Sequence, residues 1–513
     1  MMKFSCLKGL IALSLTPAFI SSGVNAANKP EAKNQKKKNV ILILLDDMRL
    51  DMAGYAGSIA QTPNLDALRN ESVEFASACT STGLSSPSRA ALFTGRYGHR
   101  TGLDDNLNLW HSRLMTLAKE QTTIIEWAHK KGYNTGYFGK WHVGFITPAM
   151  RGADEYKGTY REMLQSKPER PNFEGIDRYY DSTKVFDEKP EYYSTQKIPY
   201  EKTEAKKEFD AGKKFLENAA NDKRPIFLTV SFHTPHPPYS VPAPWNKMYD
   251  YSKIQLPESY KEHKKGLEFQ HQVMWPWMNV GHMTEDDWKK TTSYAMGLMT
   301  MFDKELGEFI DELKKQGLWE NSMIIFTSDQ GSMLAEHGLY DKGPYAYDGL
   351  MRIPMLIKVP GVGYKKINHQ VSLIDLNATM TDFMGIKPMQ KNLDSRTLLP
   401  LIYKGDEAWK NVPDEAYYRY EWYNGRWFGV RAIRTPEFKY VFNPAGDNEL
   451  YDLKNDPHEM VNLIDDVKYK EILTDLQNRL FAHLKQCDDK QAFDLMTWYT
   501  NPKAPVDANT NGE

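Results

Sequence analysis

The chain has 513 residues, of which 41% are apolar and 12% aromatic, and its formal net charge is -2. This length exceeds what one hydrophobic core usually covers, so we expect one large domain and a smaller one. The near-neutral charge excludes a general attraction to nucleic acid or to an anionic membrane surface. Any anionic substrate must therefore be held by a local site.

Residues 1–26 have the three parts of a secretory signal peptide. Two lysines lie near the start, an apolar stretch runs from Leu10 to Ile20, and Val24-Asn25-Ala26 is a small-residue cleavage site. The apolar stretch is shorter than the ~20 residues that span a bilayer, and the later sequence contains no stretch apolar enough to do so. We therefore predict cleavage and export to the periplasm or the medium, with residues 27–38 as a polar linker.

Short apolar runs alternate with longer helical patterns from residue 39 to about residue 400. Compact runs predict strands at Val40-Leu45, Thr135-Phe138, Ile226-Phe232, Met323-Thr327 and Pro354-Lys358. Apolar residues at spacings of three and four predict a helix at about Tyr294-Gln316, and further helices are predicted at Asn64-Asn70, Thr122-Lys131 and Lys206-Ala219. This alternation predicts an α/β domain over residues 39–400, with a mainly parallel sheet sandwiched by helices.

The pattern changes in residues 401–513. Short aromatic-rich strands are predicted between Ala416 and Tyr451, with turns at Asn424-Gly425 and at Ala445-Gly446-Asp447. A helix is predicted from about Tyr469 to Gln486. We therefore expect a smaller C-terminal α+β subdomain, in which a helix accompanies an antiparallel sheet.

Two segments, residues 151–200 and 240–290, are rich in Tyr, Trp, Lys, Glu and Pro and have no apolar period. We interpret both as long loops over the edge of the sheet. The chain shows no internal repeat.

Polar side chains immediately follow the ends of four of the predicted strands. In an open parallel sheet, ligands bind beyond the carboxyl ends of the strands, so these side chains are expected to face one rim. They are Asp46 and Asp47, Lys140 and His142, His233 and His236, and Asp329 and Gln330.

The oxygen-rich part of this set predicts a metal site. Three carboxylates that converge without a cation would repel one another, whereas hard oxygen ligands with one amide suit Ca²⁺ or Mg²⁺. The scarcity of histidine among these ligands makes zinc a poorer fit. An isolated aspartate pair after a strand is more often a helix cap or a turn, and only the combination favours a metal.

The segment from Ser85 to Arg96 predicts a short helix with an anion-binding start. Pro87 suits the first turn and Gly95 suits the end, so the free amides of the first turn lie at Ser85. Arg89, one turn further, could contact the same anion. The alternative is an ordinary capped helix, since serine is a common cap.

The string Ser85-x-Pro87-Ser88-Arg89, followed by Leu92-x-Thr94-Gly95-Arg96, resembles the signature of formylglycine-dependent sulfatases in the alkaline phosphatase superfamily. Gly139-Lys140-Trp141-His142 and the phrase from Tyr451 to Leu463 are also similar, so the resemblance runs from about Asn39 to Leu463. It implies the large mixed sheet of that superfamily and oxidation of Ser85 to formylglycine (3-oxoalanine). A serine at this position implies a formylglycine-generating maturase of the anaerobic type.

The resemblance also implies roles for individual residues. The metal ligands, for one divalent ion, most simply Ca²⁺ with Mg²⁺ as the alternative, would be Asp46, Asp47, Asp329, Gln330 and the modified Ser85. Gln330 departs from the family pattern, in which Asn or His is usual, although its carbonyl is still a hard oxygen. The sulfate-binding cations would be Arg89, Lys140 and Lys342, the last in a loop similar to the family's. His142 would contact the hydrated aldehyde, and His236, or alternatively His233, would protonate the leaving group.

The substrate is predicted less sharply. His233, Arg426 and Trp427 are candidate substrate-binding residues, and Trp422, His271, Trp275 and Trp277 could also contact a sugar. Export together with the serine-type signature suggests a sulfated carbohydrate such as a glycosaminoglycan or the marine polysaccharide ulvan. The alternatives are a phosphatase or phosphonate monoester hydrolase on the same fold, and a catalytically silent glycan-binding protein.

Overall fold

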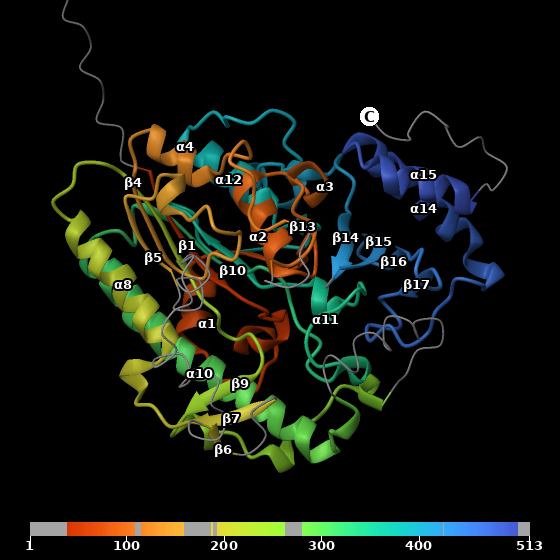
Figure 1. Ribbon diagram of the computed structural model, residues 1–513, viewed down its shortest axis with the longest axis horizontal. Helices are drawn as coiled ribbons and strands as arrows, with labels where there is room; N and C mark the ends of the chain where they lie inside the picture. The colour runs from red at the N-terminus through yellow and green to blue at the C-terminus, as the bar shows by residue number, and fades with distance from the viewer. Residues whose placement is uncertain are drawn as a thin grey trace, which may run out of the picture. The chain divides into compact units, whose positions relative to one another are not determined.

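The computed structural model describes residues 38–107, 114–158, 186–187, 192–261, 280–423 and 425–500 (Figure 1). The predicted signal peptide, residues 27–37 of the linker and the aromatic candidates His271, Trp275 and Trp277 lie outside them. Residues Lys37–Glu513 form one compact unit. Among the described helices, none combines the length and the apolar character that a membrane crossing requires.

A mixed eight-stranded sheet forms the centre of this unit (Figure 1). Its strands, in spatial order, are β12 (Lys365–Ile367), β2 (Val73–Phe75), β11 (Met355–Lys358), β10 (Ser322–Ser328), β1 (Asn39–Leu45), β8 (Ile226–Ser231), β4 (Asn134–Gly139) and β5 (Glu155–Gly158). The block from β10 to β5 is parallel, whereas β11 runs antiparallel to β10 and to β2. The five strands predicted from compact apolar runs are confirmed.

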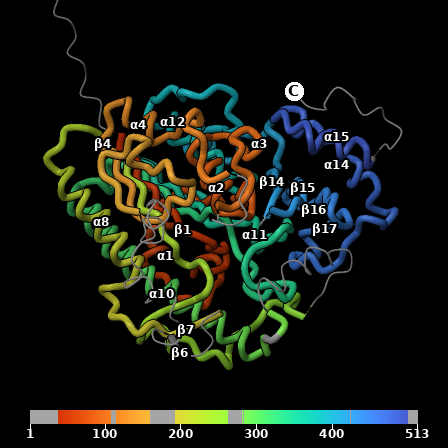
Figure 2. Tube along the Cα trace, viewed as in Figure 1, coloured from red at the N-terminus to blue at the C-terminus, as the bar shows by residue number. Residues whose placement is uncertain are grey.

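Helices cover both faces of the sheet, as expected (Figures 1 and 2). Ile41, Ile43 and Leu45 of β1 share a core with α1 (Pro63–Asn70), α8 (Glu204–Ala219) and α10 (Glu285–Lys315). Val40, Leu42 and Leu44 share the opposite core with α2 (Ser85–Thr94), α4 (Ile124–Lys130), α12 (Asp375–Met384) and α13 (Leu399–Lys404). Successive side chains of a strand alternate between its faces, so this run of apolar residues is buried on both sides.

Short elements complete the described fold. They are β3 (Ala78–Cys79), which pairs with β13 (Val371–Ser372), α3 (Gly98–Thr101), α11 (Asp348–Met351) and the 3-10 helices Leu50–Met52, Gly54–Ala56, Ala149–Arg151, Tyr200–Lys202, Trp245–Lys247, Tyr251–Lys253, Glu258–Lys261, Val280–His282, Glu336–Gly338, Asp406–Trp409 and Val467–Tyr469.

The interpretation of residues 151–200 and 240–290 as loops is wrong in part. β5 extends the central sheet, and β7 (Tyr193–Gln196) pairs in parallel with β9 (Tyr239–Pro242) and antiparallel with β6 (Phe186–Asp187). These strands are too short to show a period, and the pairing of β7 with β9 joins residues that lie far apart along the chain.

The long helix α10 begins at Glu285 rather than at Tyr294. A capping box starts it: the Thr284 side chain accepts from the amide of Asp287, and the Asp287 carboxylate accepts from the amide of Thr284 at 2.9 Å. Paired caps of this kind satisfy amides that have no partner within the helix, so a polar first turn is stable.

The predicted C-terminal sheet and helix are confirmed. β14 (Ala416–Tyr423), β15 (Arg426–Arg434), β16 (Phe438–Phe442) and β17 (Glu449–Asp452) form an antiparallel sheet, against which α14 (Lys470–Gln486) and the additional helix α15 (Lys490–Thr500) pack. Of the first predicted turn, Asn424 lies outside the described residues, and Gly425 has a positive φ of 75°.

A buried ion cluster ties this sheet to α11. Asp348 accepts from Arg434 at 2.6 and 2.9 Å, and Lys439 lies 2.6 Å from both Asp348 and Glu459. The side chain of Lys439 is fully buried, and it compensates the charge of Glu459 and, together with Arg434, that of Asp348.

Candidate active site

Three carboxylates meet where β1 and β10 end. The two strands run parallel with Leu45 opposite Ser328, so the residues that follow them, Asp46, Asp47 and Asp329, lie side by side. All three are fully buried, and a carboxylate oxygen of each lies within 4.8 Å of the others. The amide of Asp47 donates to Asp329 Oδ1 at 3.3 Å. The predicted convergence of strand ends is therefore confirmed for these residues.

Ser85 lies against this group. Its Oγ donates to Asp46 Oδ1 at 3.0 Å and accepts from Gln330 Nε2 at 2.8 Å. It is the first residue of α2, as predicted, and the helix ends at Gly95, whose φ is 71°. Backbone amides at the start of a helix favour an anion nearby, so Ser85 lies where a negatively charged group would be stabilised.

The donor set fits a hard divalent cation. The Gln330 amide nitrogen contacts Asp47 and Ser85, whereas its Oε1 is buried and has no hydrogen-bond partner among the described residues. Amide oxygen and nitrogen exchange places when the group turns by half a revolution. Turned in this way, Gln330 would direct a carbonyl oxygen at the carboxylates, and oxygen ligands of this kind suit Ca²⁺.

The acidity of two of the three carboxylates supports the same conclusion, whereas burial of Asp46 is outweighed by Lys140, His236 and Arg89, which hold its pKa well below the usual range. Burial, and then the charge of Asp46, raise the pKa of Asp329 to about 7. Burial also raises the pKa of Asp47. A bound divalent ion would stabilise the charged form of these carboxylates and would offset their mutual repulsion.

Three protein cations each hold one of the three carboxylates. Arg89 is fully buried, donates through Nε to Asp329 Oδ2 at 2.6 Å, and is fixed by Ser231 Oγ and by the Lys140 carbonyl. The pairs are Arg89 with Asp329, Lys140 with Asp46, and Lys342 with Asp47, the last at 2.6 Å. The group is balanced in charge, and a divalent ion would make it positive and therefore attractive to an anion.

Two histidines stand beside the carboxylates. Their rings stack at 4.5 Å, with His236 Nε2 2.9 Å from Lys342 Nζ and His233 Nε2 3.9 Å from Asp46 Oδ2. Because His236 Nδ1 contacts the Pro237 carbonyl, Nδ1 carries the proton and Nε2 accepts from Lys342. Burial, and then the charge of Lys342, lower the pKa of His236 to about 4, so this ring is neutral at neutral pH.

The remaining predicted residues are His142, Trp427 and Arg426. His142 has a positive φ of 53° and contacts the carbonyl of Leu107, whose amide donates to Ser86 Oγ. It therefore stands beside the start of α2. Trp427 in β15 donates to Glu421 at 2.8 Å, and Arg426 is exposed. Their substrate-binding role stays a prediction.

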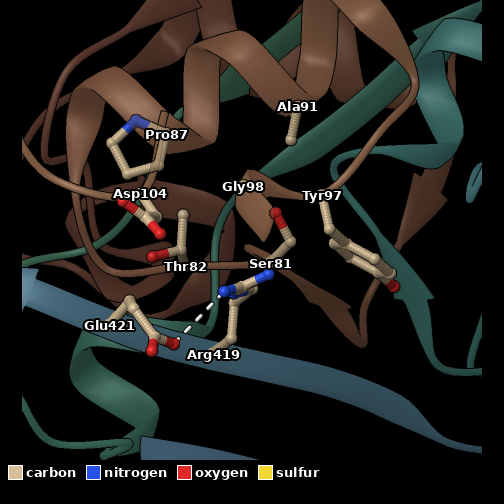
Figure 3. A pocket seen from close by; sticks show the side chains of 9 residues that line it. All are labelled: Ser81, Thr82, Pro87, Ala91, Tyr97, Gly98, Asp104, Arg419 and Glu421. Carbon is tan, nitrogen blue, oxygen red and sulfur yellow. Dashed lines mark hydrogen bonds and ion pairs between the residues drawn. The ribbon is translucent and has the colours of Figure 1, made fainter. Parts of the chain in front are cut away.

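A small pocket with a mixed polar and apolar lining lies on the other face of α2 (Figure 3). Pro87 and Ala91, one turn apart, line it, whereas Arg89 between them points to Asp329. Arg419 and Glu421 of β14 close it with an ion pair at 3.2 Å. Sequence reasoning missed this pocket, because two of its lining residues, Arg419 and Glu421, come from β14, far along the chain.

Sequence reasoning also missed Asp341 and Arg49. Asp341 Oδ1 lies 3.3 Å from Lys342 Nζ, and Arg49 follows Asp47 by two residues. The position of Asp341 next to Lys342 was an available signal, whereas nothing in the sequence marked Arg49.

Comparisons with known proteins agree with this geometry. A family model described as Sulfatase matches residues 38–386, and one described as N-sulphoglucosamine sulphohydrolase, C-terminal, matches residues 335–486. The chain is 28% identical to an ulvan-active sulfatase of Formosa agariphila, covering 94% of this chain and 87% of that protein. It is 25% identical to an N-acetylglucosamine-6-O-sulfatase of Bacteroides thetaiotaomicron, covering 94% and 93%.

Solved structures share the fold. A phosphonate monoester hydrolase of Agrobacterium radiobacter superposes with a TM-score of 0.71 at 22% identity, covering 88% of this chain and 96% of that one. A structure described as a complex with its substrate D-glucosamine-2-N,6-O-disulfate also has a TM-score of 0.71, at 20% identity, covering 88% and 99%. At these identities, the likeness shows the architecture only.

Proposed function

The chain belongs to the sulfatase family and is a sulfuric ester hydrolase, and from this premise we propose that it cleaves sulfate esters with a formylglycine made from Ser85. One observation carries the proposal. Ser85 Oγ lies 3.0 Å from Asp46 at the start of α2, inside a group of carboxylates and cations. A buried hydroxyl at that place is where a nucleophile would meet a tetrahedral anion.

The modification is needed because an unmodified serine would not support repeated turnover. A serine that displaced the alcohol would keep the sulfate as a stable ester. Oxidation by the maturase removes two hydrogens from the Ser85 hydroxymethyl group, and water adds to the aldehyde to give a geminal diol. One diol hydroxyl loses its proton and its oxygen forms a bond to sulfur, while the sulfur–oxygen bond to the alcohol breaks and the alcohol oxygen takes up a proton. The second hydroxyl then loses its proton, expels sulfate and restores the aldehyde.

The divalent ion expected for the family would supply fixed positive charge beside the nucleophile and the sulfate oxygens. The residues that would hold it are Asp46, Asp47, Asp329, Gln330 and modified Ser85. Arg89, Lys140 and Lys342, which now pair with the carboxylates, would turn their charge toward the sulfate. These three cations, together with the ion, would then stabilise the charge that develops on the sulfate.

The leaving alcohol needs a proton, and His236 or His233 can hold it at Nε2. His236 is neutral beside Lys342. A bound sulfate monoester adds a negative charge next to it and shifts the balance toward imidazolium. His142, beside the start of α2, would contact the diol.

For the substrate we infer a sulfated saccharide. The relatives named above support this class, since one is named for ulvan and another for an N-acetylglucosamine 6-sulfate. The predicted signal peptide supports action in the periplasm or outside the cell. The phosphonate monoester hydrolase shares only the fold at 22% identity, so it supports that alternative less.

Two measurements on one preparation test the proposal. The protein is co-expressed with an anaerobic-type maturase, and the peptide containing Ser85 is weighed by mass spectrometry. We expect a mass lower by two hydrogens, together with sulfate release from at least one member of a panel of sulfated oligosaccharides. Release of phosphate or phosphonate alone would support the alternative hydrolase, and an unmodified peptide without turnover would support the silent glycan-binding protein.

A further inference from the structure

Arg49 is a buried cation to which the mechanism above gives no role. Its side chain is 8% exposed and follows the Asp46-Asp47 pair by two residues. Nη1 donates to the carbonyls of Met333 at 2.6 Å and Ser332 at 3.2 Å, and Nη2 lies 2.8 Å from Glu336. A single guanidinium thus joins the turn after β1 to the segment after β10.

That segment, residues 332–342, is called the Lys342 loop here. It folds back on itself: Met333 N donates to the Asp341 carbonyl at 2.8 Å and Ala335 N to the Leu339 carbonyl at 2.8 Å. The Met333 end of the loop is therefore bonded directly to Asp341, the residue before Lys342.

Three residues of this loop have an unfavourable backbone conformation. Leu334, Ala335 and His337 have φ values of 38°, 80° and 51°, a region that side chains with a Cβ seldom occupy. Contacts from outside must therefore hold the loop in place. Arg49 supplies three of them, two to carbonyls and one to Glu336.

The space around Arg49 is fitted to this arrangement. A Cβ at Gly349 would lie 2.3 Å from Glu336 Oε2 and 3.1 Å from Arg49 Nη1. A side chain at position 349 would therefore displace the Glu336 carboxylate from its place beside Arg49. On the other side of the guanidinium, Asp51 accepts from Nε at 2.7 Å and completes its hydrogen bonds.

We propose that Arg49 is a positioning residue for Lys342. The contacts form a closed ring: Arg49 holds the Met333 carbonyl, Met333 pairs with Asp341, and the next residue, Lys342, reaches Asp47 at 2.6 Å. Asp47 lies two residues before Arg49, so the same turn holds both ends of the ring. The catalytic part of this inference rests on the proposed function, in which Lys342 binds the substrate sulfate.

The first test measures the exposure of Lys342 without any substrate. Protein is treated briefly with the N-hydroxysuccinimide ester of acetic acid, and acetylation of each lysine is followed by mass spectrometry. In Arg49→Met we expect Lys342 to react at least about tenfold faster than in the unaltered protein, because its loop is released. Lys140, also buried but outside the loop, is the internal reference and keeps its rate.

Arg151→Met is the matched control. Arg151 is 1% exposed and donates to the carbonyls of Leu117, Ala118 and Gln121, so its removal costs similar hydrogen bonds elsewhere in the fold. This variant leaves the reaction rate of Lys342 unchanged. Glu336→Gln, a milder change, gives an intermediate rate if Arg49→Met fails to fold.

The second test is a double-mutant cycle on sulfate release, with the active oligosaccharide of the panel as substrate. With Lys342 present, Arg49→Met lowers kcat by about 10- to 100-fold, as expected for a displaced catalytic group. In the Lys342→Ala background the same change costs less than about twofold, because the group to be positioned is gone. Arg151→Met costs the same factor in both backgrounds.

Equal Lys342 acetylation in Arg49→Met and Arg151→Met, or equal losses of kcat for Arg49→Met in both backgrounds, would overturn the proposal. A protein that releases no sulfate at all would refute the proposed function instead, and the acetylation test would still decide whether Arg49 holds the loop.

Discussion

Replacing Ser85 by alanine separates chemistry from folding. The hydroxyl makes two hydrogen bonds, to Asp46 and from Gln330, and a typical hydrogen bond contributes about 1 kcal/mol to stability. We therefore expect Ser85→Ala to lower the free energy of unfolding by about 1–3 kcal/mol. Turnover should fall at least about 10⁴-fold, as it does when a covalent nucleophile is removed.

Ser88→Ala is the matched control for this change. Ser88 lies on the same helix, is equally buried, and also makes two hydrogen bonds, to the Asp329 carbonyl at 2.6 Å and with Thr80 at 3.1 Å. Its loss should cost a similar stability, about 1–3 kcal/mol. Its turnover should stay within about threefold of the unaltered enzyme, once mass spectrometry confirms that Ser85 is oxidised in this variant.

Stability is measured by urea unfolding and turnover by ion chromatography of released sulfate. If Ser85→Ala keeps more than about 1% of the turnover, Ser85 is not the nucleophile, because a missing nucleophile costs far more. Equal losses of turnover in both variants would mean that the helix, rather than the hydroxyl, is what matters.

Three further results are expected. A chelator lowers the melting temperature and Ca²⁺ restores it, since the buried carboxylates repel without an ion; an unchanged temperature in scanning fluorimetry would argue against the metal site. Lys439→Met lowers the free energy of urea unfolding by about 3–5 kcal/mol, because Asp348 and Glu459 lose a buried partner, and adding Glu459→Gln recovers part of it; a loss below about 1 kcal/mol would contradict this. Burial would raise the pKa of Asp348, but Arg434 and Lys439 outweigh burial and hold this pKa well below its usual range. The ionised carboxylate therefore stabilises the fold fully at neutral pH, and this contribution declines as the pH falls below about 4. Asp348→Asn should flatten that decline in acid unfolding curves.

The parts of the fold that could be predicted are those with a strong local signal. β1 is a run of apolar residues too short for a helix, and its two faces pack as such a run implies. The meeting of Asp46 and Asp329 followed from parallel strands that end at one edge, and α2 followed from Pro87 and Gly95.

What escaped prediction depends on residues that are close only in space. β7 and β9 pair across more than forty residues, and neither shows a period. Arg49 and Met333 are separated by 284 positions, and an arginine two residues after an aspartate pair is unremarkable in a sequence. The balance between three carboxylates and three cations also emerges only after folding, because Lys342 comes from a loop without regular pattern.

The burial of β1 on both faces has a consequence for how the enzyme loses activity. A central strand held by neighbours on both edges and covered on both faces opens only when the whole domain unfolds, so its amides should be among the slowest to exchange with deuterium. Asp46 and Asp47 continue that strand directly. Fraying of peripheral helices such as α15 should leave turnover intact, and heat inactivation should coincide with global melting rather than precede it.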